Sequence, residues 1–199
     1  MKLYLSVIGG GMLIISAVNI AFGTAVWYYV ISAVVWCTVL CIIFDGAMAI
    51  LANKILPERW FRIDSPRFEV SEREKELYKK LRVRLWKDKV LELGGLGGFS
   101  KKRLSEPNNP EYIERFIVEC NKGVLTHRLS YPMGFLTMLT TFNICAFTVA
   151  LPVAIVNLFL NILPTLALRY NTPKLKSLLI RLNRKRERQE ALSTVASGD

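Results

Sequence analysis

The sequence has no charged side chain in residues 3–44 or in residues 131–168. A helix that crosses a bilayer needs about 20 predominantly apolar residues, so each uncharged stretch is long enough for two crossings. Soluble domains of average composition carry charge more evenly along the chain. We therefore expect an all-α integral membrane protein with about four transmembrane helices in two hairpins, accompanied by cytoplasmic amphipathic helices.

The chain also lacks the signatures of several common chemistries. Its four cysteines form no C-x-x-C pair and it has one histidine, so neither a disulfide framework nor a multi-histidine metal site is expected. It has no G-x-S-x-G motif and no His-x-x-x-x-Asp motif of glycerolipid acyltransferases. The glycine-rich run at residues 94–98 follows no predicted strand, as a dinucleotide-binding turn would. We expect no metal and no cofactor.

Basic residues are distributed unevenly, and this asymmetry predicts the topology. Residues 53–130 contain 18 Lys/Arg and 12 Asp/Glu, and residues 169–199 contain 8 and 3, in a chain of net charge +11. The turns expected inside the two hairpins carry no charge. The positive-inside rule therefore predicts a multi-pass protein of the cell membrane with both termini and residues 53–130 cytoplasmic. Since the basic residues flank the spans, we expect them to bind membrane lipids and not nucleic acid.

The same pattern divides the chain into four segments. Residues 1–52 should form an N-terminal transmembrane hairpin, and residues 53–130 a cytoplasmic or interfacial helical segment. Residues 131–168 should form a second hairpin with its turn near Pro152, in which both spans are short or one is re-entrant. Residues 169–199 should form a basic amphipathic helix with a disordered tail from residue 191.

Three amphipathic helices are expected in the charged segments. Ser71 and Glu74 form an S-x-x-E capping box ahead of a basic helix over residues 71–93, which should lie in the headgroup plane. Asn109 before Pro110 predicts the start of a second helix, which ends near His127. A third helix should begin at residues 172–173, with a leucine stripe typical of a membrane-surface anchor. The expected apolar faces are Leu77, Leu81, Leu85, Trp86, Val90 and Leu93; Tyr112, Ile113, Phe116, Ile117, Cys120 and Val124; and Leu175, Leu178, Leu179 and Leu182.

Several polar side chains stand within the expected spans. Asp45, near the cytoplasmic end of the second span, is either a functional acid or a snorkelling group that pairs with a cytoplasmic base. Asn143, Asn157 and Asn161 should face protein and not lipid, because an unpaired amide is costly in hydrocarbon.

We expect three groups of polar residues at the cytoplasmic boundary: residues 86–89, Glu119 with His127, and residues 161–164 together with 169–175. His127 and Glu119 suit general-base activation of a hydroxyl, although a lone histidine is also compatible with a structural role. Their spacing corresponds to about 12 Å along a helix, so they would face one cleft at two heights without touching. Arginine, asparagine and lysine side chains bind phosphate or orient a carbonyl oxygen. The substrate-binding candidates are Trp86, Lys87, Lys89, Asn161, Arg169, Tyr170 and Asn171.

Four motifs follow one another along the chain: W-K-x-K at residues 86–89, E-x7-H at 119–127, N-x-x-P at 161–164 and R-Y-N-x-P-x-L at 169–175. In this order, within residues 61–188, the sequence resembles the glycosyl-4,4'-diaponeurosporenoate acyltransferase family of staphyloxanthin biosynthesis. The resemblance implies transfer of a fatty acyl group to a sugar hydroxyl of a membrane-bound glycolipid. We expect the acyl donor to be a thioester such as acyl-CoA. The resemblance also implies functional roles for Trp86, Glu119, His127, Arg169, Tyr170 and Asn171.

The chain departs from the family pattern beside the histidine. Such proteins usually have a second glutamate three residues before the histidine and a tryptophan after it, where this chain has Val124 and Arg128. A glutamate–histidine dyad one helical turn apart is therefore not expected. Nothing in these residues requires the acceptor to be a carotenoid.

Two functions remain open from the sequence. In the first, a membrane acyltransferase uses His127 as general base, with Glu119 orienting it or binding the acceptor. Arg169, Asn171 and the basic helix would hold the acyl donor, and the acyl chain would lie among the spans. In the second, the chain is a non-enzymatic membrane scaffold or partner subunit whose charged helices bind anionic lipid or another membrane protein.

Overall fold

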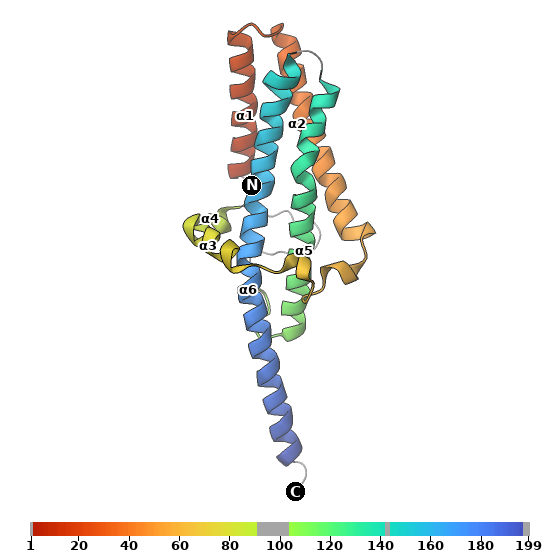
Figure 1. Ribbon diagram of the computed structural model, residues 1–199, viewed down its shortest axis with the longest axis vertical. Coiled ribbons are helices and arrows are strands. Elements are labelled where there is room, and N and C mark those ends of the chain that lie inside the picture. The colour runs from red at the N-terminus through yellow and green to blue at the C-terminus, as the bar shows by residue number, and fades with distance from the viewer. Residues whose placement is uncertain (1, 91–103, 142–143, 197–199) are drawn as a thin grey trace.

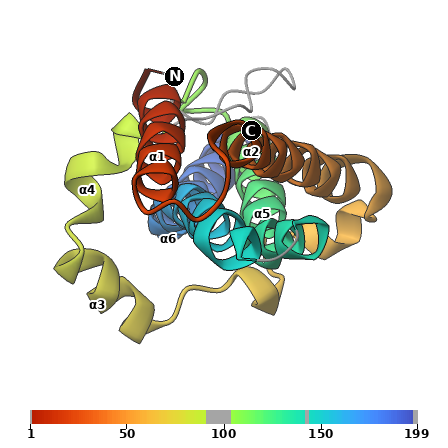
Figure 2. The same cartoon turned by 90° about the horizontal axis from the view of Figure 1, so that it is seen from above.

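The computed structural model describes residues 2–90, 104–141 and 144–196, and every secondary-structure element in them is helical. Four long helices form a bundle: α1 (Lys2–Ala21), α2 (Trp27–Ile50), α5 (Pro110–Met133) and α6 (Leu151–Ala196) (Figure 1). Seen end-on, these helices stand together, with α3 and α4 beside them (Figure 2). The shorter elements are η1 (Leu51–Ile55), η2 (Glu58–Phe61), η3 (Pro66–Phe68), α3 (Glu72–Lys80), α4 (Val83–Trp86), η4 (Lys87–Lys89), η6 (Gly134–Thr140) and η7 (Ala146–Ala150). The prediction of an all-α chain is confirmed.

Among the described residues, three helical stretches are long and apolar enough to cross a membrane: Tyr4–Ala21, Trp27–Ile55 and Ala146–Ser193. A fourth part of the bundle consists of two consecutive elements, because the chain continues from α5 directly into η6. The chain then reverses direction before η7. A 3-10 helix rises about 2.0 Å per residue, against about 1.5 Å in an α-helix. The 3-10 helix η6 is therefore longer than an α-helix of the same number of residues would be. The predicted turn near Pro152 is wrong. This proline lies just after the junction of η7 and α6, inside the continuous helical stretch Ala146–Ser193.

Helix α6 runs without interruption through Pro164 and Pro173 to Ala196. The predicted helix start at residues 172–173 is therefore wrong, and so is the predicted disorder for residues 191–196. Proline removes the N–H that would bond the carbonyl four residues earlier. At Pro164 the freed carbonyl is that of Leu160, and the hydroxyl of Tyr4 on α1 donates to it at 3.1 Å. A neighbouring helix thus stabilises a position that local rules treat as a break.

The leucine stripe of α6 packs against the apolar stripe of α5. Leu175 and Leu179 are buried in one cluster with Ile113, Ile117 and their neighbours on α5. The prediction of a membrane-surface anchor is wrong for this stripe, because the protein itself covers it. Burying each aliphatic side chain contributes about 1.5–3 kcal/mol, so this seam holds the charged ends of the two helices together. Segment boundaries were expected at residues 130 and 168, but α5 continues without a break through residue 130 and α6 continues without a break through residue 168.

The basic helix expected over residues 71–93 is broken. It begins after Ser71, whose hydroxyl accepts the Glu74 N–H at 3.2 Å, but it ends at Lys80. Arg82 then adopts a φ of 49°, in the left-handed region that non-glycine residues seldom occupy, and α4 follows.

The leucine face of α3 and α4 stays open. Leu77, Leu81 and Leu85 are exposed, as a headgroup-facing surface would be, whereas Tyr78 is buried towards α6. Residues 91–103, which include the end of the predicted helix and the glycine-rich run, lie outside the described residues.

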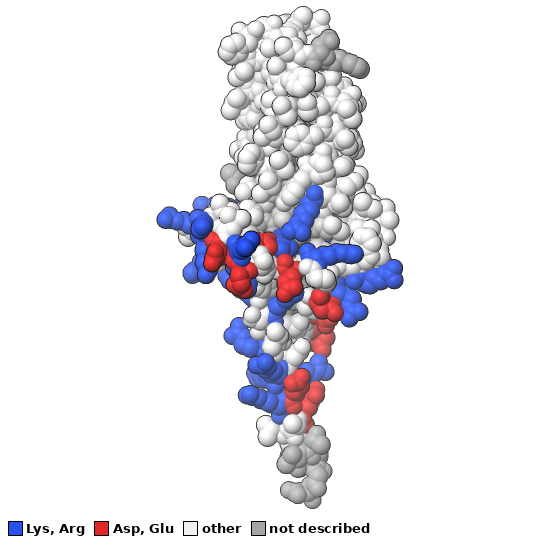
Figure 3. All heavy atoms as spheres, viewed as in Figure 1, with Lys and Arg blue, Asp and Glu red and all other residues white. Residues whose placement is uncertain are grey.

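Charged side chains gather over the middle and lower parts of the molecule, and the upper part of the face in Figure 3 has none. The upper part holds the α1–α2 turn, where Gly23 has a φ of 63°, and the reversal between η6 and η7. The amide of Asn19 in α1 donates to the carbonyl of Thr148 in η7 at 2.8 Å. The two uncharged turns therefore lie side by side at one end of the bundle.

Candidate functional site

A chain of hydrogen bonds connects three helices inside the bundle. His127 Nδ1 on α5 lies 2.8 Å from Oδ1 of Asn161 on α6, and Nδ2 of Asn161 donates to Oδ2 of Asp45 on α2 at 3.1 Å. One turn earlier on α6, Nδ2 of Asn157 lies 3.5 Å from Oδ1 of Asp45. Both asparagines are buried, and Asp45 and His127 are half-buried. We call these four residues the polar relay.

The partners of Asn161 determine which way its amide points. Its Nδ2 faces two acceptors, a carboxyl oxygen of Asp45 and the main-chain carbonyl of Asn157 at 3.1 Å. Oδ1 must then face His127, and because a carbonyl oxygen only accepts hydrogen bonds, the imidazole carries its proton on Nδ1. In the neutral ring, Nε2 then has the lone pair that a general base needs.

At Gly134, η6 packs closely against α6 beside the relay residue Asn157. A Cβ at this position would lie 3.2 Å from Nδ2 of Asn157 and 3.4 Å from the Cα of Ala154. The missing side chain lets η6 approach α6 closely.

The relay resolves the alternatives for Asp45. Among the residues that the structure describes, its carboxyl accepts hydrogen bonds from two asparagine amides inside the bundle and does not pair with a cytoplasmic base. The predictions that Asn157 and Asn161 face protein are confirmed, while Asn143 lies outside the described residues. The prediction that a helix ends near His127 is wrong, because α5 continues to Met133.

Sequence reasoning did not connect Asp45 and Asn157 with His127. A signal was present, because Asn157 and Asn161 are four residues apart and share one face of a helix. Two amides on one face of an uncharged span require polar partners on a neighbouring helix. The identity of those partners depends on how the helices pack.

Glu119 occupies a different part of α5. Its carboxylate pairs with Lys122 at 2.9 Å, and the same ammonium lies 3.8 Å from Glu58 in η2. Glu119 and His127 are eight positions apart, which corresponds to about 12 Å of helix, so this carboxylate does not reach the imidazole.

Arg169, expected to bind substrate, holds α3 against α6. Its Nε and Nη2 donate to the two carboxyl oxygens of Glu74, with 2.6 Å between Nη2 and Oε2. Nη2 also donates to the carbonyl of Glu69 at 2.8 Å, and the Tyr78 hydroxyl donates to the Glu74 carboxylate. We call Glu74, Tyr78 and Arg169 the interfacial clamp.

The clamp changes the ionisation of Glu74. Burial alone would raise the pKa of this carboxyl, but the hydrogen bonds from Arg169 and Tyr78 outweigh burial and hold the pKa below its usual range. Burial and the bond to Glu74 raise the pKa of Tyr78. Because the carboxylate is engaged by a two-pronged guanidinium, the capping box predicted with Ser71 is only half formed: the hydroxyl caps α3, while Glu74 turns to α6.

Tyr170 and Asn171 follow the clamp arginine on α6. The ring of Tyr170 meets that of Tyr78 edge-on, with centroids 6.2 Å apart, and the ammonium of Lys174 lies 4.0 Å from the Tyr170 centroid. Tyr170 therefore lies at the contact between α3 and α6. Asn171 is half-buried.

The W-K-x-K motif lies where α4 and η4 pack against α6. Trp86 is half-buried and donates from Nε1 to the carbonyl of Leu81 at 3.0 Å. Lys87 pairs with Asp88 at 2.8 Å, and Lys89 is exposed. The candidates therefore separate into the relay, with His127 and Asn161, and a charged region outside the apolar part of the bundle.

The described residues contain no group of three or more His, Cys, Asp or Glu side chains that could hold a metal ion. The four cysteines are buried free thiols. The chemistry that the relay can perform is proton transfer at Nε2 of His127, supported through Nδ1 by Asn161 and Asp45.

Comparison with known proteins identifies one family. Its sequence profile, described as glycosyl-4,4'-diaponeurosporenoate acyltransferase, matches residues 57–181. The match includes the interfacial clamp and the relay residues of α5 and α6, whereas Asp45 precedes it. No curated protein and no solved structure matches the chain. Because the match covers more than half of the sequence, the chain belongs to the glycosyl-4,4'-diaponeurosporenoate acyltransferase family and is an acyltransferase.

Proposed function

We propose that this acyltransferase moves a fatty acyl group from a thioester donor such as acyl-CoA to a hydroxyl of a membrane-bound glycolipid, with His127 as general base. The observation that carries the proposal is the hydrogen bond from Nδ1 of His127 to Asn161, which Asp45 holds in place. In this bond Nδ1 is the donor, and in our proposal Nε2 accepts the proton.

The reaction is a direct transfer. Nε2 of His127 takes the proton of the acceptor hydroxyl as its oxygen attacks the carbonyl carbon of the thioester. The new C–O bond forms, the C–S bond breaks, and the leaving thiolate takes the proton from the imidazolium. The carbonyl of Asn161, backed by Asp45, stabilises the positive ring during the step.

The charged region serves the polar parts of the substrates in this proposal. Lys87 and Lys89 carry positive charge beside α6 and suit the phosphates of the donor. Glu119, with Lys122, offers hydrogen-bonding groups to an acceptor sugar on the α5 side. Arg169 takes the role of holding α3 on α6, since Glu74 occupies its guanidinium.

The charge distribution supports a multi-pass orientation in the cell membrane. The charged region would lie on the cytoplasmic side with both termini, and the two uncharged turns on the other side. A cytoplasmic donor would then reach the relay from the charged side, while the acceptor lipid stays in the bilayer.

The experiment is an acyl-transfer assay on the full-length protein in nanodiscs, with acyl-CoA as donor and an extract of membrane glycolipids as acceptor. His127→Gln should lower the rate by about 10²–10⁴-fold, the usual contribution of a general base. Glu114→Gln, an exposed change on the same helix, is the matched control and should leave the rate unchanged.

Transfer at a near-normal rate by His127→Gln would contradict the assignment of the base. A wild-type protein that binds anionic vesicles but transfers no acyl group to any acceptor in the extract would instead support the scaffold interpretation.

A further inference from the structure

A narrow apolar groove lies between α1, α2 and α6. Its walls are side chains from one face of each helix, and its volume is about 40 Å³. The lining residues are Ile8, Gly11, Met12, Ile15, Thr38, Cys41, Ile42, Val153, Val156, Asn157 and Leu160. None of these residues is charged, and the Thr38 hydroxyl is already bonded to the carbonyl of Val34.

The groove is continuous with the polar relay. Asn157 lines it and also contacts Asp45, so the groove begins where the relay ends. From Leu160 back to Val153 it follows α6 for about 10 Å, towards the end of the bundle that carries the uncharged turns. One end of the groove is therefore at Asn157, which contacts Asp45 of the relay, and the rest of its lining is uncharged and mostly apolar.

We propose that this groove binds the fatty acyl chain of the donor, with the part of the chain nearer the thioester at Asn157 and the methyl end towards the uncharged turns. The proposal rests on the proposed function for its reaction, but it names a separate binding site. The chain must part the helices to enter, because the volume accommodates only a short piece of it. Helix α1 is the wall suited to move, since Ile15 and Asn19 are its only buried side chains among residues 4–21.

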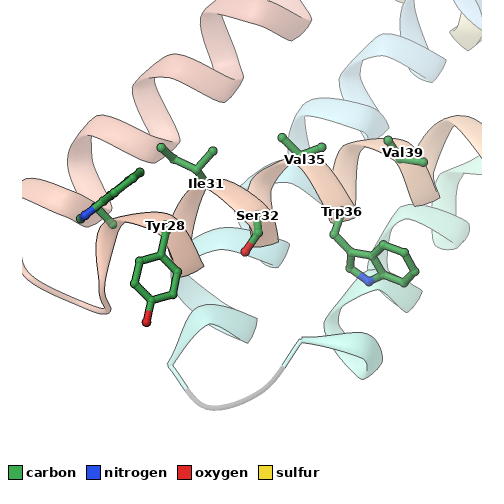
Figure 4. A pocket seen from close by; sticks show the side chains of 7 residues that line it. Tyr28, Ile31, Ser32, Val35, Trp36 and Val39 are labelled. Atoms are coloured by element: carbon green, nitrogen blue, oxygen red, sulfur yellow. The ribbon is translucent and has the colours of Figure 1, made fainter.

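A second groove offers a useful contrast. It runs along the outer face of α2 and has a volume of about 390 Å³ (Figure 4). All of its lining residues, including Tyr28, Ser32 and Trp36, belong to that one helix, and none belongs to the relay. This open surface suits bilayer lipid, so it serves as the reference for non-specific contact with an acyl chain.

Gly11 gives a direct test of the groove. A Cβ there would lie 3.8 Å from a methyl of Val156 across the groove, so a larger side chain would project into the space between α1 and α6. At Gly9 and Gly10 on the same helix, a Cβ would meet nothing within 4 Å, so these two positions are matched controls.

The first experiment offers full-length protein in nanodiscs a mixture of saturated acyl-CoA donors of graded length. Gly11→Leu should shift the products to shorter chains, with a loss of about fourfold in relative rate for each methylene that no longer fits. Gly9→Leu and Gly10→Leu should keep the wild-type distribution. An active Gly11→Leu protein with an unchanged distribution would overturn the proposal.

Variants that widen the groove cover the case in which Gly11→Leu does not fold. Met12→Ala should shift the products towards longer or branched chains, as the removed side chain leaves room beside Gly11. The same distribution as wild type in a folded Met12→Ala protein would also overturn the proposal.

The second experiment does not depend on turnover. Palmitoyl-CoA with a diazirine on its chain is photolysed with His127→Gln protein, and the labelled residues are mapped by mass spectrometry. Labels should concentrate on residues 8–15 and 153–160. Labelling that is equally strong on the outer face of α2 would reject the groove. If the groove is labelled but wild-type protein transfers no acyl group, the binding site stands and the proposed function fails.

Discussion

Replacing Asp45 with asparagine should change the tautomer of His127, although Asp45 acts on the ring only through Asn161. The carboxyl group accepts from Nδ2 of Asn161 at 3.1 Å and so directs Oδ1 of that amide to the imidazole. An amide at position 45 offers a donor as well as an acceptor, which lets Asn161 rotate. If its Nδ2 then donates to Nδ1 of His127, the ring proton moves to Nε2, and the base has no lone pair for the acceptor hydroxyl.

The expected magnitude follows from the contacts that are lost. A buried polar group left without a partner costs about 1–3 kcal/mol. In Asp45→Ala, Asn161 keeps its bond to the Asn157 carbonyl at 3.1 Å, and the contact between Asn157 and Asp45 that is lost is long at 3.5 Å. Asp45→Ala should therefore lower the free energy of unfolding by about 2 kcal/mol, and Asp45→Asn by less. An aspartate-to-asparagine change beside a catalytic histidine costs about 10⁴ in a serine protease triad, and the indirect contact here should reduce the loss to about 10².

Histidine-selective ¹⁵N labelling measures the tautomer directly, because His127 is the only histidine in the sequence. Wild-type protein in nanodiscs should show a protonated Nδ1, and Asp45→Asn a shift of the proton to Nε2 together with slower acyl transfer. Asp64→Asn, at an exposed pair 3.3 Å from Arg62, is the control and should change neither. A wild-type ring protonated on Nε2, or a slow Asp45→Asn enzyme with an unchanged tautomer, would refute the reasoning.

Two further predictions concern the interfacial clamp. Arg169→Ala leaves the Glu74 carboxylate without its main partner and should lower the free energy of unfolding by about 3 kcal/mol, measured by thermal denaturation. In the control Arg62→Ala, where the ion pair with Asp64 is exposed, the loss should stay below about 1 kcal/mol. Equal losses in the two variants would contradict a special role for the clamp. Acid should also release α3: because the folded protein holds the pKa of Glu74 below its unfolded value, the clamp stabilises the fold at neutral pH and weakens as the pH falls below about 4. Hydrogen exchange of residues 72–80 should accelerate in that range, and Glu74→Gln should remove this pH dependence.

The relay joins parts of the chain that differ in their relation to the family. His127 and Asn161 lie within the matched residues 57–181, whereas Asp45 comes from the preceding hairpin. The walls that α1 and α2 contribute to the apolar groove also precede the match. In our proposal, therefore, the N-terminal hairpin supports the base and shapes the donor site, in addition to anchoring the enzyme.

Features that depend on neighbouring residues could be predicted from the sequence. Uncharged stretches longer than a bilayer crossing indicated the apolar helices. Ser71 and Asn109 cap their helices as expected, each accepting a main-chain N–H three residues later. The apolar stripe beginning at Ile113 is buried because a period of 3.6 residues places it on one face.

Other features depended on which helices meet. The helix continues through Pro164 because the Tyr4 hydroxyl on another helix donates to the Leu160 carbonyl that the proline leaves without an N–H partner. Glu74 does not complete its capping box because Arg169 offers a stronger partner. Asp45 and Asn161, 116 residues apart, become partners only when α2 packs beside α6. Local rules act within about one helical turn, whereas hydrogen bonds between helices require the register and rotation of both. The sequence by itself therefore determined that the uncharged stretches form apolar helices, and the tertiary structure decided where the helices end and which partners the polar side chains find.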